Sequence, residues 1–252
     1  MSDASGDLAV LLTTLRATVP ALHGRIGTPS PDQLQCASPG NPQRIAALHA
    51  HWQRAHPGAG RHYWTTRSWT LLIWQPIYLS LLAVHLQHRA PCLGQLGQSV
   101  CDGFVGGFSL PSHSPQRGEQ QELIALAAGQ IGDFVERQLD EFDRVASIHP
   151  KLARLFAVDC TRAALLLVQR RLGLPNSALR ELEACWLRAL AMPRSSALLE
   201  VRLDDGRECL ALGRNACCQH FRREDGEFCS TCPKLKPAER QRRLREELAK
   251  VD

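Results

Sequence analysis

Four cysteines form the most chemically specific feature of the chain. They lie in the segment RNACCQHFRREDGEFCSTCPK near the C-terminus, with the spacing C-C-x10-C-x2-C: Cys217, Cys218, Cys229 and Cys232. A Glu-Asp-Gly sequence at 224–226 favours a turn, which can fold the second pair of cysteines back onto the first. Thiolates are soft donors that suit iron–sulfur clusters and zinc. The segment therefore predicts a metal centre.

The adjacency of Cys217 and Cys218 helps to separate the two metals. Consecutive Cα atoms lie ~3.8 Å apart, and neighbouring side chains of a strand point to opposite faces. A binuclear [2Fe–2S] cluster offers well-separated positions to such a pair, whereas zinc more often binds two C-x2-C knuckles. Zinc keeps an alternative set in which Cys218 takes no part: Cys217, His220, Cys229 and Cys232. The iron–sulfur interpretation is favoured, and zinc stays open.

Composition places these cysteines in a reducing compartment. Ten cysteines in a chain of 252 residues favour metal or redox chemistry over a disulfide framework when the protein is intracellular. The first residues, MSDASGDLAVLLTTL, carry acids where a secretory signal would carry Lys or Arg, so we expect a cytoplasmic protein. A formal net charge of +5 is too small to imply nucleic acid, and we expect none as a partner.

The cysteine segment resembles the C-terminal motif of the FhuF-type siderophore-iron reductases, most strongly from Arg214 to Pro233. The resemblance implies that the four cysteines bind a [2Fe–2S] cluster. It also implies one-electron reduction of a ferric siderophore in the cytoplasm, which releases iron because oxygen ligands bind Fe(II) more weakly than the harder Fe(III). Such a reductase needs an electron donor, such as a ferredoxin, a flavodoxin or a flavin reductase.

Residues outside the four cysteines have candidate roles of two kinds. Arg214, His220 and Arg222 flank the cysteines and could raise the cluster potential by hydrogen bonds or positive charge, although solvated polar residues give the same pattern. A segment rich in His, Arg and Trp could line a pocket for a ferric chelate, although its aromatic residues could equally be core anchors. From this segment we select three pocket candidates: Trp64, Arg67 and Trp69.

Two other classes of function remain open. The first is a zinc-stabilised interaction module, and the second is an iron–sulfur sensor of redox state or iron. A DNA-binding sensor would normally carry a concentrated basic reading helix, and the terminal helix PAERQRRLREELAKVD is too mixed in charge for that role. The basic side of this helix could dock an acidic electron donor, or it could simply be solvated.

The elements that must position the cysteines are mainly helical. Apolar residues recur at helical spacing in 8–15, 45–52 and 119–148, and two more helices follow, the second capped by Asn176 or Ser177. Residues 27–42 predict a loop, and 95–115 predict a short strand between turns. The apolar stretch 69–86 approaches membrane-spanning length, but Gln75 and Pro76 interrupt it, so we interpret it as a core helix.

These elements predict an α+β fold that is mainly α. Residues 1–195 form a helical body that could hold the ferric-siderophore pocket. Residues 196–252 contain a β-hairpin around Asp205-Gly206, the cysteine segment and a basic helix. The hairpin leads almost directly into Cys217 and could present the cysteines to the body. Peripheral membrane contact stays open.

Overall fold

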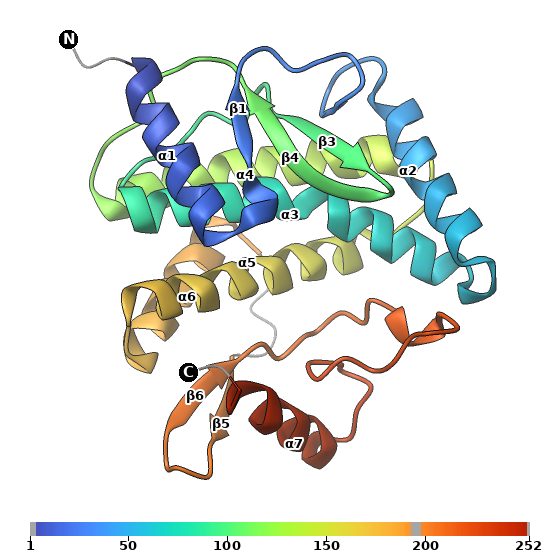
Figure 1. Cartoon of the computed structure of the whole chain (residues 1–252), viewed down its shortest axis with the longest axis vertical. Coiled ribbons are helices and arrows are strands. Elements are labelled where there is room, and N and C mark those ends of the chain that lie inside the picture. The colour runs from blue at the N-terminus through green and yellow to red at the C-terminus, as the bar shows by residue number, and fades with distance from the viewer. Residues whose placement is uncertain (1–3, 193–197, 251–252) are drawn as a thin grey trace.

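The computed structural model describes residues 4–192 and 198–250 and confirms the predicted α+β, mainly α fold (Figure 1). Its helices are α1 (Ala4–Thr18), α2 (Asn41–Ala55), α3 (Arg61–Gln87), α4 (Gln120–Asp143), α5 (Pro150–Leu172), α6 (Asn176–Ala189) and α7 (Pro237–Leu248). Its strands are β1 (Gly24–Ile26), β2 (Leu34–Gln35), β3 (Gly97–Cys101), β4 (Phe104–Leu110), β5 (Leu199–Arg202) and β6 (Glu208–Ala211).

Helix α3 forms the centre of the helical body. By length and composition it could cross a membrane, but 78% of its most apolar stretch is buried within the protein. It packs against α4 and α5, and its side chains join those of α1, α2 and α6 in one large core. Burial on nearly all sides explains why this helix is apolar all round. The structure thus places 69–86 as a core helix.

A four-stranded sheet packs on one side of the body, in the order β1-β4-β3-β2. Strands β3 and β4 form an antiparallel hairpin, and β1 pairs in parallel with β4. The prediction of one strand in 95–115 was therefore incomplete, and the prediction of a loop over 27–42 missed β2. The preceding strand β1 was not predicted either. Both of these strands are short and depend on partners distant in sequence, so local periodicity could not reveal them.

The helix boundaries differ from the prediction at two points. The helix predicted over 119–148 ends at Asp143, and Pro150 occupies the first turn of α5, where its missing N–H costs nothing. Helix α5 ends before Gly173, whose φ of 63° suits glycine, as the sequence indicated. The predicted cap of α6 was wrong, because Pro175 occupies that position. Asn176 instead donates to the carbonyl of Glu208 at 2.8 Å and ties α6 to β6.

Strands β5 and β6 form the predicted hairpin, with Gly206 in its turn at a φ of 88°. Helix α7 packs on this hairpin, and together they enclose a small second core: Val201, Leu203, Ala211 and Leu244. Figure 1 shows the hairpin and α7 on the side of the body where α5 lies. The division at 195/196 stays a prediction, and it falls within 193–197, outside the described residues.

Candidate metal centre

The vicinal cysteines are attached to the helical body on both sides. Before them, the buried carboxylate of Asp159 on α5 accepts hydrogen bonds from the backbone N–H groups of Asn215 (3.1 Å) and Ala216 (3.2 Å). The side-chain amide of Asn215 donates to the same carboxylate at 3.2 Å. On the other side, the Thr66 hydroxyl on α3 donates to the carbonyl of Cys218 at 3.0 Å. Two helices of the body therefore fix the position of the first pair of thiols.

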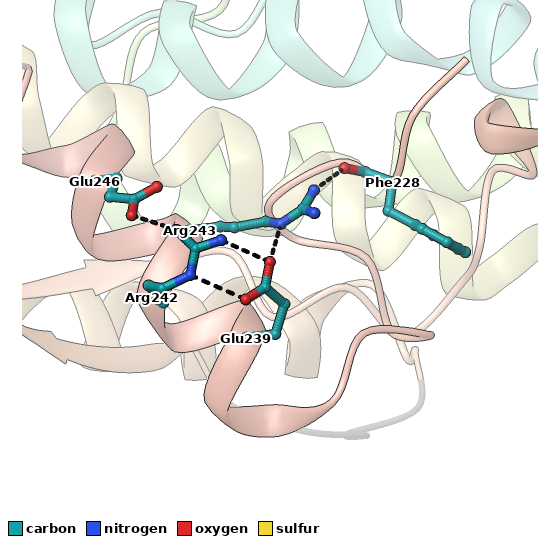
Figure 2. A network of polar contacts seen from close by, with 5 residues as sticks. All are labelled: Phe228, Glu239, Arg242, Arg243 and Glu246. Atoms are coloured by element: carbon teal, nitrogen blue, oxygen red, sulfur yellow. Dashed lines mark hydrogen bonds and ion pairs between the residues drawn. The ribbon is translucent and has the colours of Figure 1, made fainter.

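The second pair of cysteines is held by the C-terminal helix. The predicted turn forms, with the N–H of Gly226 donating to the carbonyl of Arg223 at 3.1 Å. Figure 2 shows Arg243 of α7 donating to the carbonyl of Phe228, at 2.8 Å, while Glu239 holds the same guanidinium at 2.6 Å. Beyond Cys229, the Ser230 hydroxyl donates to Glu247. Helix α7 thus fixes the backbone immediately before and after Cys229.

These contacts bring the four thiols together. The Cys218 thiol is hydrogen-bonded to Cys229, Cys229 to Cys232, and Cys232 to Cys217. The bond from Cys218 lowers the pKa of Cys229, and the same bond together with burial raises the pKa of Cys218. Burial raises the pKa of Cys232, which is only 3% exposed. The pair Cys218 and Cys229 therefore favours one thiolate, on Cys229.

Three of the sulfur atoms also accept hydrogen bonds from the residue two positions further on. The backbone N–H groups of His220 and Lys234 donate to Cys218 and Cys232, and the Thr231 hydroxyl lies 3.6 Å from the sulfur of Cys229. Donors directed at sulfur stabilise the thiolate over the thiol. The backbone of both loops is therefore already shaped to accept negative sulfur.

The donor set fits a binuclear iron–sulfur cluster. Within 4–192 and 198–250, no three His, Cys, Asp or Glu side chains converge as they would around one metal ion. The four soft sulfurs are linked to one another by hydrogen bonds, and a [2Fe–2S] cluster takes four cysteine ligands. His220, which the zinc alternative would use, has its ring 6.3 Å from that of Tyr63, and burial and the nearby Arg223 lower its pKa.

A cavity of about 570 Å³ opens beside the first pair of thiols and is bordered by Cys218 and Cys229. The other residues that matter for its chemistry come from α3, β4, α5 and the chain after β6: Tyr63, Arg67, Thr70, Trp74, Tyr78, Phe104, Asp159, Arg214 and His220. The volume is typical of small-molecule sites in proteins. A ligand in this cavity would lie directly against two of the four sulfurs.

Among the predicted pocket residues, the structure places Arg67 in this cavity but not the two tryptophans. Trp69 is fully buried, and its indole donates to the carbonyl of Ala153 at 3.1 Å. The indole of Trp64 donates to the carbonyl of His56 at 2.8 Å. Both tryptophans thus serve the packing of α3 against neighbouring segments.

The three residues that could tune the cluster potential lie in different surroundings. Arg214 lines the cavity, and its positive charge favours the thiolate forms of Cys218 and Cys229. His220 borders the cavity as well. Arg222 instead donates to the side chain of Gln219 at 3.0 Å. Of the three, Arg214 has the clearest electrostatic effect on the thiols.

Sequence reasoning missed Asp159 and Thr66, which attach the cysteine segment to the body. A signal existed for Asp159, because an isolated acid within the apolar run FAVDCTRAALLL of a helix is expensive to bury without donors. Thr66 gave no such signal, because threonine is common on helices and its partner lies far along the chain.

One comparison with known proteins bears on this segment. Residues 214–234 match the family model described as the FhuF 2Fe-2S C-terminal domain. This match confirms the resemblance that the cysteine spacing indicated, and it covers all four cysteines. It also supports a [2Fe–2S] cluster as the group that they bind. The helical body, with most of the cavity lining, lies outside the matched residues.

Proposed function

We propose that this protein is a cytoplasmic ferric-siderophore reductase whose [2Fe–2S] cluster is bound by Cys217, Cys218, Cys229 and Cys232. One observation carries the proposal: the paired thiols of a FhuF-type segment border a cavity large enough for part of an iron chelate. An electron-transfer centre needs a substrate site close to it, and the cavity supplies one.

The chemistry requires only that one electron reach the substrate. When bound, the cluster supplies single electrons. Fe(III) in an oxygen-donor chelate becomes Fe(II), which hard oxygen ligands hold far less strongly, so the metal can leave. The electron must be replaced by a one-electron donor, for which a ferredoxin, a flavodoxin or a flavin reductase is suited. No covalent bond between protein and chelate is formed or broken.

Different residues of the chain have different roles at the proposed centre. Burial of Cys232 shields one side of the centre from water, whereas the half-buried Cys218 and Cys229 face the cavity. The backbone and hydroxyl donors at sulfur, together with the nearby Arg214, stabilise negative charge there and so favour a higher reduction potential. Asp159 and Thr66 keep the vicinal pair against the body.

A single-turnover experiment tests the proposal. The protein is reduced with dithionite, freed of excess reductant and mixed anaerobically with a ferric siderophore and an Fe(II) chelator. We expect the visible spectrum of the oxidised cluster to return as Fe(II) appears, one iron per cluster. Cys209→Ser is the matched control, because Cys209 lies on β6 away from the four thiols and should not affect the result. Persistence of the reduced spectrum with no Fe(II) formed would refute the proposal.

A further inference from the structure

One face of α3 differs from the rest of this buried helix. From 65 to 85 every residue is buried except four, which recur at spacings of three or four: Arg67, Thr70, Trp74 and Tyr78. Residues at such spacings share one side of a helix. All four line the cavity beside Cys218 and Cys229. At a rise of about 1.5 Å per residue, the stripe extends roughly 16 Å.

The stripe offers aromatic surface at a fixed position. The indole N–H of Trp74 donates to the carbonyl of Val105 at 2.8 Å, which holds the ring against the sheet. Its ring centroid lies 5.7 Å from that of Tyr78 and 6.0 Å from that of Phe104. Phe104 is 42% exposed and lines the same cavity. These three rings provide a wall suited to flat apolar or aromatic groups of a ligand.

Two guanidinium groups in the same cavity have unused donors. The Nε atoms of Arg67 and Arg214 are buried, and neither has a hydrogen-bond partner among the described residues. Stacking on Trp52, whose ring centroid lies 4.6 Å from Cζ, holds the Arg67 side chain in place. Both guanidinium groups line the cavity, so their positive charges favour an anionic ligand there.

The other titratable groups do not cancel this positive charge. Asp159 is the acid of the lining, and its carboxylate is already used by the N–H groups of Asn215 and Ala216. His220 also borders the cavity. Burial raises the pKa values of Tyr63 and Tyr78, so both phenols are neutral too. Outside the cysteines the lining therefore carries a net positive charge, two arginines against one acid, while the cysteine sulfurs bring negative charge at one edge.

We propose that this cavity binds an anionic ferric chelate with flat aromatic or apolar arms. Arg67 and Arg214 contact its metal-binding oxygens, and Trp74, Tyr78 and Phe104 contact its arms. The inference rests on the proposed reductase function and adds the charge class of the substrate. It also assigns the Cys218/Cys229 side of the centre as the side from which the electron leaves.

The test uses gallium(III) complexes, because Ga(III) resembles Fe(III) in size and charge but does not accept the electron. Affinity for the cluster-loaded protein is measured by titration calorimetry with a trianionic tris-catecholate complex and with a cationic, amine-bearing tris-hydroxamate complex. We expect Arg67→Gln and Arg214→Gln each to weaken binding of the trianionic complex by roughly tenfold or more. Arg61→Gln is the control, because Arg61 lies at the exposed start of α3 and does not line this cavity.

A second measurement locates the bound complex. The electron paramagnetic resonance spectrum of the reduced protein should shift when the trianionic gallium complex is added, because the complex lies against Cys218 and Cys229. Equal affinity for the two complexes, or unchanged affinity in both arginine variants, would overturn the inference.

These results separate the inference from the proposed function. If Fe(III) chelates are reduced normally while both arginine variants bind the gallium complex like the wild type, the site assignment fails and the reductase stands. If the gallium complex binds with the expected charge dependence but Fe(III) is never reduced, the binding site stands and the reductase fails.

Discussion

Replacing Asp159 by alanine should release the vicinal cysteines from the helical body. The change removes the acceptor of the N–H groups of Asn215 and Ala216 and of the Asn215 amide, at 3.1–3.2 Å. A hydrogen bond to a charged group contributes about 1.5–3 kcal/mol. Burial raises the pKa of Asp159, so part of that gain already offsets the cost of burying the charge. We therefore expect a net loss of about 2–4 kcal/mol of docking free energy.

A loss of that size increases the detached fraction of the segment by roughly 30-fold to 1,000-fold. The assay follows the visible absorbance of the cluster-loaded protein in excess iron chelator and gives a rate of iron loss. Asp159→Ala should lose iron fastest, and Asp159→Asn, which keeps one acceptor oxygen, should lie between it and the wild type. Asp140→Ala removes an exposed carboxylate on α4 and serves as the control. Iron loss from Asp159→Ala at the wild-type rate would refute the anchoring role.

Three further predictions concern the metal and the body. Cys218→Ser should abolish the cluster and His220→Gln should retain it, as iron analysis after anaerobic purification will show; the zinc alternative requires the opposite. Burial lowers the pKa of His85 from 6.5 to about 4. Between these two pH values the folded protein binds fewer protons than the unfolded chain. The stability present above pH 6.5 is therefore lost as the pH falls towards 4. Urea unfolding should show about 2 kcal/mol of this loss between pH 7 and pH 5, and His85→Gln should remove it. Glu183→Ala removes the carboxylate that pairs with the buried Arg162 and should lower the free energy of unfolding by about 3–5 kcal/mol. Replacing both residues by Met should restore most of that loss.

The cysteine segment was the part of the molecule that local sequence predicted best. Its determinants lie within one short segment: soft donors, a turn at 224–226 and a C-x2-C knuckle. The hairpin before it was also predictable, because alternating residues around Asp205-Gly206 are a local signal. Such features need no knowledge of distant partners.

The pocket was predicted poorly because it depends on which face of α3 remains uncovered. Trp64 and Trp69 have the residue type of a binding site, but packing with neighbouring segments uses their indoles. The lining residues Trp74 and Tyr78 lie within the stretch interpreted as core. The signal that could have predicted the cavity lining was the recurrence of polar and aromatic residues at helical spacing along an apolar helix. Which side of the helix the cysteine segment would approach was set by Asp159 and Thr66, through contacts over long sequence distances.

The central claim is that the four thiols bind a [2Fe–2S] cluster, and metal and sulfide analysis of the anaerobically purified protein tests it most directly. The account predicts two iron and two acid-labile sulfide per chain. It also predicts thiolate-to-iron charge-transfer absorption that Cys218→Ser abolishes and Cys209→Ser leaves intact. A colourless protein with one zinc per chain and no labile sulfide would contradict the account.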